Sequence, residues 1–163
     1  MNLRILCYIL LALTLAMSAF PQTPTTQPQD FVSAGVSYSP GASPSVAGTA
    51  LYGRLIAGTG TYAFTVYDAL PTSVKPLTVT SQVSTGIAQR VATVGNVDIF
   101  IPTAAGVSYN GTNTGWAWTT GALAVIPFSK TWRLAPNLRF VKSSVSGGSG
   151  YQMIGGILLG WRW

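Results

Sequence analysis

The 163-residue chain is 48% hydrophobic but only 7% charged, and its lysines and arginines outnumber its acids by nine to three. A soluble domain typically carries about 25% charged residues, so this composition argues against a surface that faces water throughout. The length leaves room for one domain and a targeting segment rather than for two domains. Because the basic residues are scattered singly along the chain, nucleic-acid binding is not predicted.

The inventory of reactive side chains is short. Histidine and glutamate are absent, and the acids are Asp30, Asp68 and Asp98. The chain therefore lacks the side chains needed for a histidine-activated nucleophile, for a paired-carboxylate acid–base site, or for a metal centre built from histidine and cysteine. The sequence predicts a protein that is not an enzyme, with no catalytic residues, no cofactor and no bound metal.

The first 19 residues predict a secretory signal peptide. Arg4 supplies the positive start, residues 5–16 form an apolar stretch, and residues 16–19 offer small side chains for cleavage. The apolar stretch is shorter than the ~20 residues that a spanning helix needs. Cys7 lies inside this segment, so the mature chain is expected to hold no thiol. Residues 20–30, rich in Pro, Thr and Gln, are predicted to be a flexible periplasmic segment.

Residues 31–163 alternate apolar with small or polar residues in eight segments, the pattern of transmembrane strands. The segments are 31–39, 46–57, 61–69, 77–92, 97–107, 115–128, 131–142 and 151–163. The connections look tight at 58–60, 94–96 and 129–130, and longer at 40–45, 70–76, 108–114 and 143–150. This order predicts an all-β fold, a closed antiparallel up-and-down transmembrane β-barrel. Pro102 and Pro136 fall inside segments, where bulges or local unpairing are expected.

The two faces of each segment differ. In the last segment Ile157, Leu159 and Trp161 share one face, and small or polar residues share the other. The polar face is too poor in charge to meet water, so we expect it to line a narrow lumen while the apolar face meets lipid. The polar network predicted in the lumen comprises Arg54, Gln82, Arg90, Asp98, Arg133, Asn137, Arg139, Gln152 and Arg162.

A carboxylate enclosed in this lumen needs a partner. We single out Asp98, and two interpretations of its surroundings stay open. In one, ion pairs between Asp98 and the arginines plug the barrel; in the other, the arginines line a gated, anion-selective path. An eight-stranded barrel is just wide enough to be filled by side chains, which favours the plug.

Aromatic residues cluster where strands begin and end, as expected of the girdles at membrane–water interfaces. The predicted interfacial aromatics are Trp116, Trp118, Phe128 and Trp132.

The end of the chain carries a resemblance. Leu159, Trp161 and Trp163 alternate in the final segment. In this feature and in its strand pattern the chain resembles the small eight-stranded bacterial outer-membrane proteins of the OmpA-domain and OmpX type. The resemblance implies that these three residues form the signal read by the barrel-assembly machinery, and that the chain lies in the outer membrane of a Gram-negative bacterium. The family pattern also favours a glycine five residues before the end, where this chain has Leu158.

Three functional hypotheses follow. The leading one is a non-enzymatic outer-membrane barrel with a structural or surface-interaction role, whose predicted partners are the lipid bilayer and, during biogenesis, the assembly machinery. The alternative is a narrow, porin-like path for small solutes or anions. The third is a soluble, lipocalin-like barrel that binds an apolar ligand, which requires the apolar face to point inward.

Overall fold

The computed structural model describes residues 30–40, 45–57, 60–74, 77–145 and 152–162. The strands are β1 (Asp30–Ser39), β2 (Ser45–Ala57), β3 (Thr61–Val74), β4 (Leu77–Val94), β5 (Val97–Tyr109), β6 (Thr114–Pro127), β7 (Trp132–Ser143) and β8 (Gln152–Arg162). The predicted signal peptide, and the segment that follows it as far as residue 29, lie outside these described residues. Within the described part of the chain, no helix is long and apolar enough to cross a membrane.

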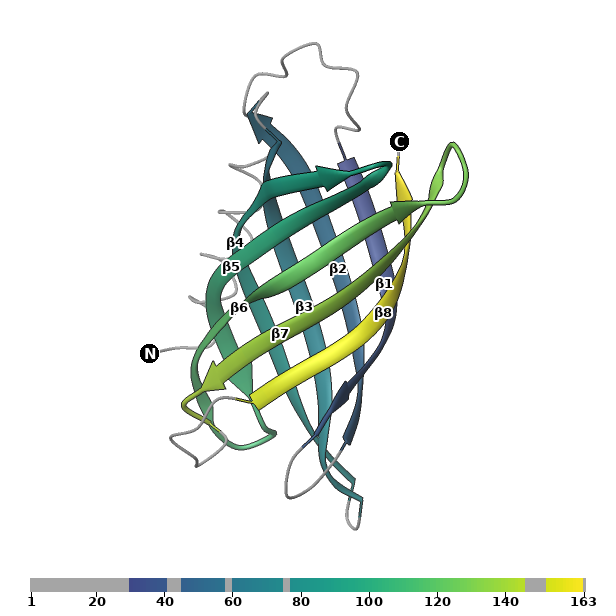
Figure 1. Ribbon diagram of the computed structural model, residues 1–163. Coiled ribbons are helices and arrows are strands. Elements are labelled where there is room, and N and C mark those ends of the chain that lie inside the picture. The colour runs from purple at the N-terminus through teal and green to yellow at the C-terminus, as the bar shows by residue number, and fades with distance from the viewer. Residues whose placement is uncertain (1–29, 41–44, 58–59, 75–76, 146–151, 163) are drawn as a thin grey trace.

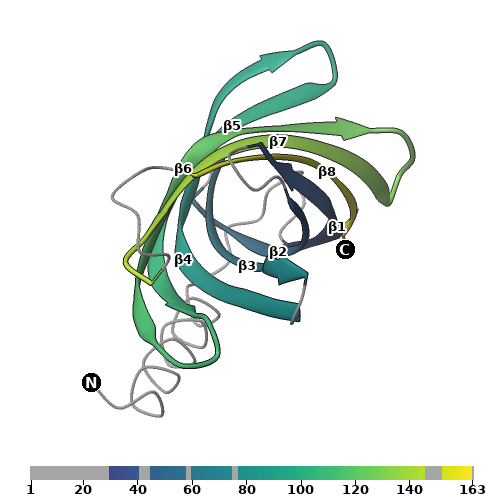
Figure 2. The same ribbon diagram turned by 90° about the horizontal axis from the view of Figure 1, so that it is seen from below.

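The eight strands form a closed barrel in sequence order, which confirms the predicted fold (Figures 1 and 2). Each strand pairs antiparallel with the next, and β8 closes the ring against β1 from Phe31↔Arg162 to Tyr38↔Gly155. We call the end that holds the start of β1 and the end of β8 the terminal rim, which lies at the top of Figure 1. The opposite end is the distal rim.

One predicted connection is wrong. Residues 70–76 were expected to form a loop, but β3 runs to Val74 and β4 begins at Leu77, so only residues 75–76 join them. The pairing of β3 with β4 passes through Pro71 by a register shift between Pro71 and Ser73. A bulge of this kind accommodates a proline, which has no N–H to give to the ladder.

The two prolines predicted to disturb the sheet do so, and both disturbances face β6. The register of β5 with β6 is interrupted beside Ile101 and Pro102, and that of β7 with β6 is interrupted beside Ala135 and Pro136. On their other sides both prolines remain in register with β4 and β8. Local unpairing on one side is what the missing N–H predicts.

On β7 and β8 the apolar face points outward, as predicted, whereas on β3 the large apolar residues Tyr62, Phe64 and Val66 are buried. Leu134, Leu138, Ile157 and Leu159 are 38–56% exposed, whereas Arg139 on the opposite face of β7 is 2% exposed. A soluble barrel that binds an apolar ligand requires the reverse arrangement, so the exposed apolar residues of β7 and β8 argue against the third hypothesis.

The interior has two layers, one of which the sequence did not predict. The half toward the distal rim is mainly polar, and its buried side chains include Ser37, Thr49, Asp68, Gln82 and Arg139. The half toward the terminal rim is apolar, and its main members are Leu51, Tyr62, Phe64, Phe100, Leu123 and Leu158. A lumen of small and polar residues alone was expected. Instead, large apolar side chains fill the space there, because an enclosed position accepts any side chain that packs.

Glycines at inward positions allow the strands to curve closely against one another. A β-carbon added at Gly121 would lie 2.1 Å from the carbonyl oxygen of Leu138, and one added at Gly106 would lie 1.9 Å from that of Val83. No real side chain tolerates such contacts, so these positions require glycine.

Candidate functional site

An ion pair spans the lumen. Arg139 on β7 donates from Nη1 to Asp68 Oδ2 at 2.9 Å and from Nη2 to Asp68 Oδ1 at 2.7 Å. The side chains of Arg139 and Asp68 are only 2% and 0% exposed. Because β3 and β7 stand four strands apart in a ring of eight, this two-pronged contact crosses the interior. It joins opposite walls of the barrel at that level, with both side chains shielded from solvent.

Asn137 and Thr49 form hydrogen bonds with this pair, and Ser37 forms one with Thr49. Arg139 Nε donates to Asn137 Oδ1 at 3.2 Å, and Arg139 Nη2 lies 3.4 Å from Thr49 Oγ1. The Thr49 hydroxyl donates to Asp68 Oδ1 at 2.7 Å and lies 3.0 Å from Ser37 Oγ. A buried charge is tolerated when it is paired and hydrogen-bonded, and both conditions hold here. We call these five residues the central network.

Sequence reasoning missed Asp68, the most buried acid of the described residues. Its segment alternates clearly, with Tyr62, Phe64 and Val66 on the side of Asp68, and the rule that large apolar residues face lipid would place this side outside. All three are buried inside the barrel. Only the inward placement of these apolar side chains reveals that Asp68 also points into the lumen.

Two further residues of the predicted lumen network lie toward the distal rim. Gln82 is buried and donates to Ser84 Oγ at 3.4 Å. Gln152 donates to Ser39 Oγ at 2.8 Å. Neither hydrogen bond involves the central network.

Asp98 occupies a different place from the central ion pair. It lies at the terminal rim, where its Oδ1 is 3.7 Å from Arg90 Nη1 and accepts a 2.7 Å hydrogen bond from the Thr93 hydroxyl. Its side chain is 35% exposed and that of Arg90 is 26% exposed. The carboxylate enclosed with Arg139 is therefore Asp68, and Asp98 forms a separate, partly exposed pair.

Arg54 does not line the lumen, and that prediction is wrong. On β2 the buried residues Ala47, Thr49 and Leu51 share the face opposite to Arg54. Arg54 is in register with Asp30 on the outer face, where its Nε lies 3.7 Å from Asp30 Oδ1. The segment carries apolar residues on both faces, so its alternation did not say which face is inside. Arg162 ends β8, and its side chain lies outside the described residues.

The predicted interfacial aromatics form two groups on the outer surface. Trp116 and Trp118 lie near the distal rim, and Lys142 Nζ is 6.0 Å from the centre of the Trp116 ring. Phe128 and Trp132 lie at the turn between β6 and β7, at the terminal rim. The exposed fractions are 52% for Trp116, 56% for Phe128 and 44% for Trp132, whereas Trp118 is half-buried.

The proposed assembly signal can be followed only in part. Leu159 and Trp161 are 48% and 45% exposed on the outer face of β8. Trp163 lies outside the described residues.

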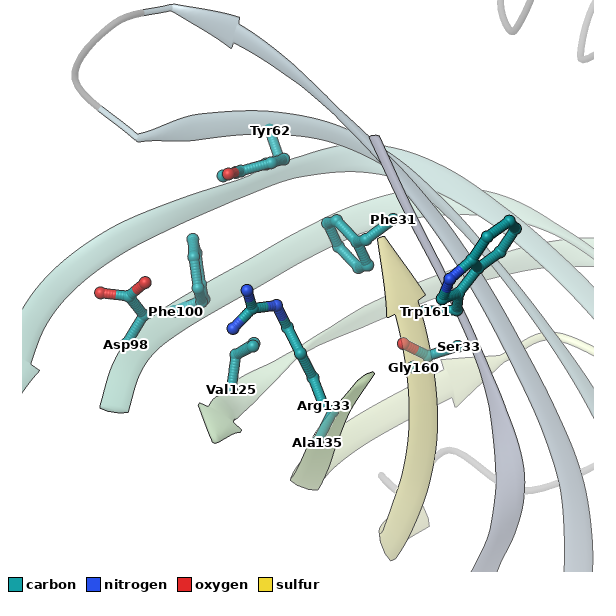
Figure 3. A pocket seen from close by; sticks show the side chains of 10 residues that line it. All are labelled: Phe31, Ser33, Tyr62, Asp98, Phe100, Val125, Arg133, Ala135, Gly160 and Trp161. Carbon is teal, nitrogen blue, oxygen red and sulfur yellow. The ribbon is translucent and has the colours of Figure 1, made fainter. Parts of the chain in front are cut away.

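A cavity of about 60 Å³ opens inside the terminal rim (Figure 3). Its aromatic wall is formed by Phe31, Tyr62 and Phe100, whose rings meet edge to face at centroid distances of 5.4 Å and 5.5 Å. Asp98 and Arg133 bring charge to the same space. Sequence reasoning placed Arg133 in the lumen but gave no sign of the aromatic wall, whose members come from three separate strands. Among the described residues, no cluster of three or more potential metal ligands occurs.

The geometry is that of a small, eight-stranded barrel with a filled interior. No family model and no curated protein matches the chain. Solved structures do share its fold. The N-terminal β-barrel domain of OprF from Pseudomonas aeruginosa gives a TM-score of 0.59 at 11% identity, covering 84% of this chain and 100% of that one.

Two other outer-membrane proteins are similarly related. Ail from Yersinia pestis, in a phospholipid nanodisc, gives a TM-score of 0.56 at 10% identity and covers 84% of this chain and 100% of its own. The Neisserial surface protein NspA gives 0.56 at 11% identity, with 82% and 94% covered. These similarities confirm the architectural resemblance to small outer-membrane barrels, and at such low identities they concern the fold alone.

Proposed function

We propose that this protein is a non-enzymatic, integral β-barrel of the bacterial outer membrane with a structural or surface-interaction role. In this proposal the N-terminal segment directs export. Leu159, Trp161 and Trp163 present the last strand to the barrel-assembly machinery.

The outer surface supports a location in lipid. Each of the eight strands carries at least one exposed large apolar side chain, and β2 and β3 contribute Val46 and Tyr67. A transmembrane strand needs about 9–11 residues, and the strands here contain 10–18. Aromatic side chains near both rims fit the two interfaces of a bilayer.

The single observation that carries the proposed role is the closed lumen. The ion pair between Arg139 and Asp68 crosses the distal half, and the apolar layer around Phe64 and Leu158 fills the terminal half. A continuous aqueous path needs polar, hydrated space, which the apolar layer does not offer. This argues against the porin-like alternative and leaves the surfaces of the barrel, rather than its interior, to carry the function.

Two measurements test the proposal. The protein produced with its own leader should appear in the outer-membrane fraction and be released only by detergent, and its migration on SDS gels should change on heating. Recovery in the soluble periplasmic fraction would contradict the membrane location. In planar bilayers the pure protein should give no steady current, and reproducible single-channel steps would favour the porin-like alternative instead.

A further inference from the structure

The cavity at the terminal rim combines an apolar floor with a charged mouth. Phe31, Tyr62 and Phe100 border it from three strands, and beneath them lies the buried apolar layer. Arg133, one of the first residues of β7, extends its guanidinium toward the space between Phe31 and Phe100 (Figure 3). Asp98 and Arg90 are 35% and 26% exposed, whereas Tyr62 and Phe100 are 5% and 7% exposed, so these two charged groups lie closer to solvent than the two aromatic rings.

The charges at the mouth favour an anion. Asp98 is held by Arg90 at 3.7 Å and by the Thr93 hydroxyl at 2.7 Å. Among the described side chains at this end of the lumen, two guanidinium groups, Arg90 and Arg133, stand against one carboxylate, Asp98, which leaves one net positive charge. A guanidinium carries five donors in a planar fork, which suits the two oxygens of a carboxylate.

The size of the space restricts the apolar part of the ligand. The cavity measures about 60 Å³, which is well under half of the roughly 150 Å³ in which benzene binds in an engineered protein cavity. A flat ring therefore does not fit between Phe31, Tyr62 and Phe100, and at the same volume per carbon atom the cavity takes only about the last two or three carbons of an alkyl chain. The ligand expected from size and charge together is short and linear.

We propose that this cavity binds a short-chain alkyl carboxylate. The alkyl chain lies against the aromatic wall of Phe31, Tyr62 and Phe100, and the carboxylate accepts hydrogen bonds from Arg133 at the mouth. This binding site goes beyond the proposed structural role and does not depend on it, because the site is enclosed by the barrel itself.

The experiment is a titration of the folded, ¹⁵N-labelled protein in a non-ionic detergent micelle. Pentanoate is the probe because it is water-soluble and partitions little into the micelle. Pentan-1-ol and pentylammonium share its chain but lack its charge or reverse it. With pentanoate we expect saturable shifts of the amide signals of Phe31, Tyr62, Phe100 and Arg133. The dissociation constants of pentan-1-ol and pentylammonium should be at least about tenfold higher than that of pentanoate.

Variants separate the roles of charge and space. Arg133→Gln should weaken pentanoate binding about tenfold or more, since it removes a charge-assisted contact. Arg54→Gln loses the same charge at the same rim but on the outer face, and should leave binding unchanged. Ala135→Leu adds bulk to the cavity wall and should abolish binding of the probe.

The outcomes are distinct. Equal binding of pentanoate and pentan-1-ol, or unchanged affinity in Arg133→Gln, would overturn the carboxylate site. So would the absence of saturable shifts in the wild-type protein. Each variant is first checked for heat-modifiable migration; if Arg133→Gln does not fold, Arg133→Lys keeps the charge without the fork and should still bind more weakly. A correctly inserted barrel that ignores pentanoate would refute this inference and leave the proposed function standing.

Discussion

Replacing Asp68 by asparagine should cost about 3–5 kcal/mol of unfolding free energy, the usual penalty for leaving one charge of a buried pair alone. The structure favours this range because Arg139 is 2% exposed and donates two hydrogen bonds, at 2.9 Å and 2.7 Å, to the carboxylate. The variant keeps the contacts of Arg139 with Asn137 and Thr49, but neither neutral group balances its charge.

The assay is reversible urea unfolding in detergent or lipid vesicles, followed by tryptophan fluorescence. The double variant Asp68→Leu with Arg139→Met should return close to wild-type stability, because two apolar side chains need no charge compensation. Asp98→Asn serves as the control: its pair with Arg90 has a single 3.7 Å contact and is partly exposed, so about 1 kcal/mol or less is expected. If Asp68→Asn lowered the unfolding free energy no more than Asp98→Asn does, the buried pair of Asp68 and Arg139 would not be a major source of stability.

Two further perturbations test the packing of the wall and its outer face. Gly121→Val places a β-carbon 2.1 Å from the carbonyl oxygen of Leu138 and should destabilise the barrel by about 3 kcal/mol in the same assay. Gly48→Val, whose added β-carbon has no atom within 4 Å, should be nearly neutral. Equal effects of the two variants would show that β6 and β7 do not approach so closely at Gly121. Ile157→Arg, in the middle of β8 and 56% exposed, should cost about 2–4 kcal/mol in vesicles. Val94→Arg at the rim should cost about 1 kcal/mol or less, and similar losses for the two arginines would argue against a lipid-facing belt.

Local alternation was enough to predict much of this protein. The eight strands, and the outward face of Leu134, Leu138 and Ile157, follow from a period of two, because successive side chains of a strand point to opposite sides. The disturbance at Pro102 and Pro136 follows from the missing N–H, which is a property of the residue itself.

Alternation failed where both faces of a strand carry similar side chains. Arg54 lies on the outside because the neighbouring Leu51 points inward, and nothing in that segment distinguishes the two faces. On β3 the alternation is clear, but the face with Tyr62 and Phe64 points inward, so the rule that apolar residues meet lipid fails there. An enclosed position accepts an apolar side chain that fills the space, or a polar one that also finds a hydrogen-bond partner.

The sequence by itself therefore determined the barrel and the apolar character of its outer face. Only the tertiary structure decided that Arg139 meets Asp68, since the two residues lie 71 positions apart and face each other only when the ring closes. The closure of the barrel and the register of its strands determine which inward side chains face one another across the lumen. No local sequence pattern specifies this pairing. The aromatic cavity beside Arg133 arises in the same way, from strands that meet only in the folded barrel.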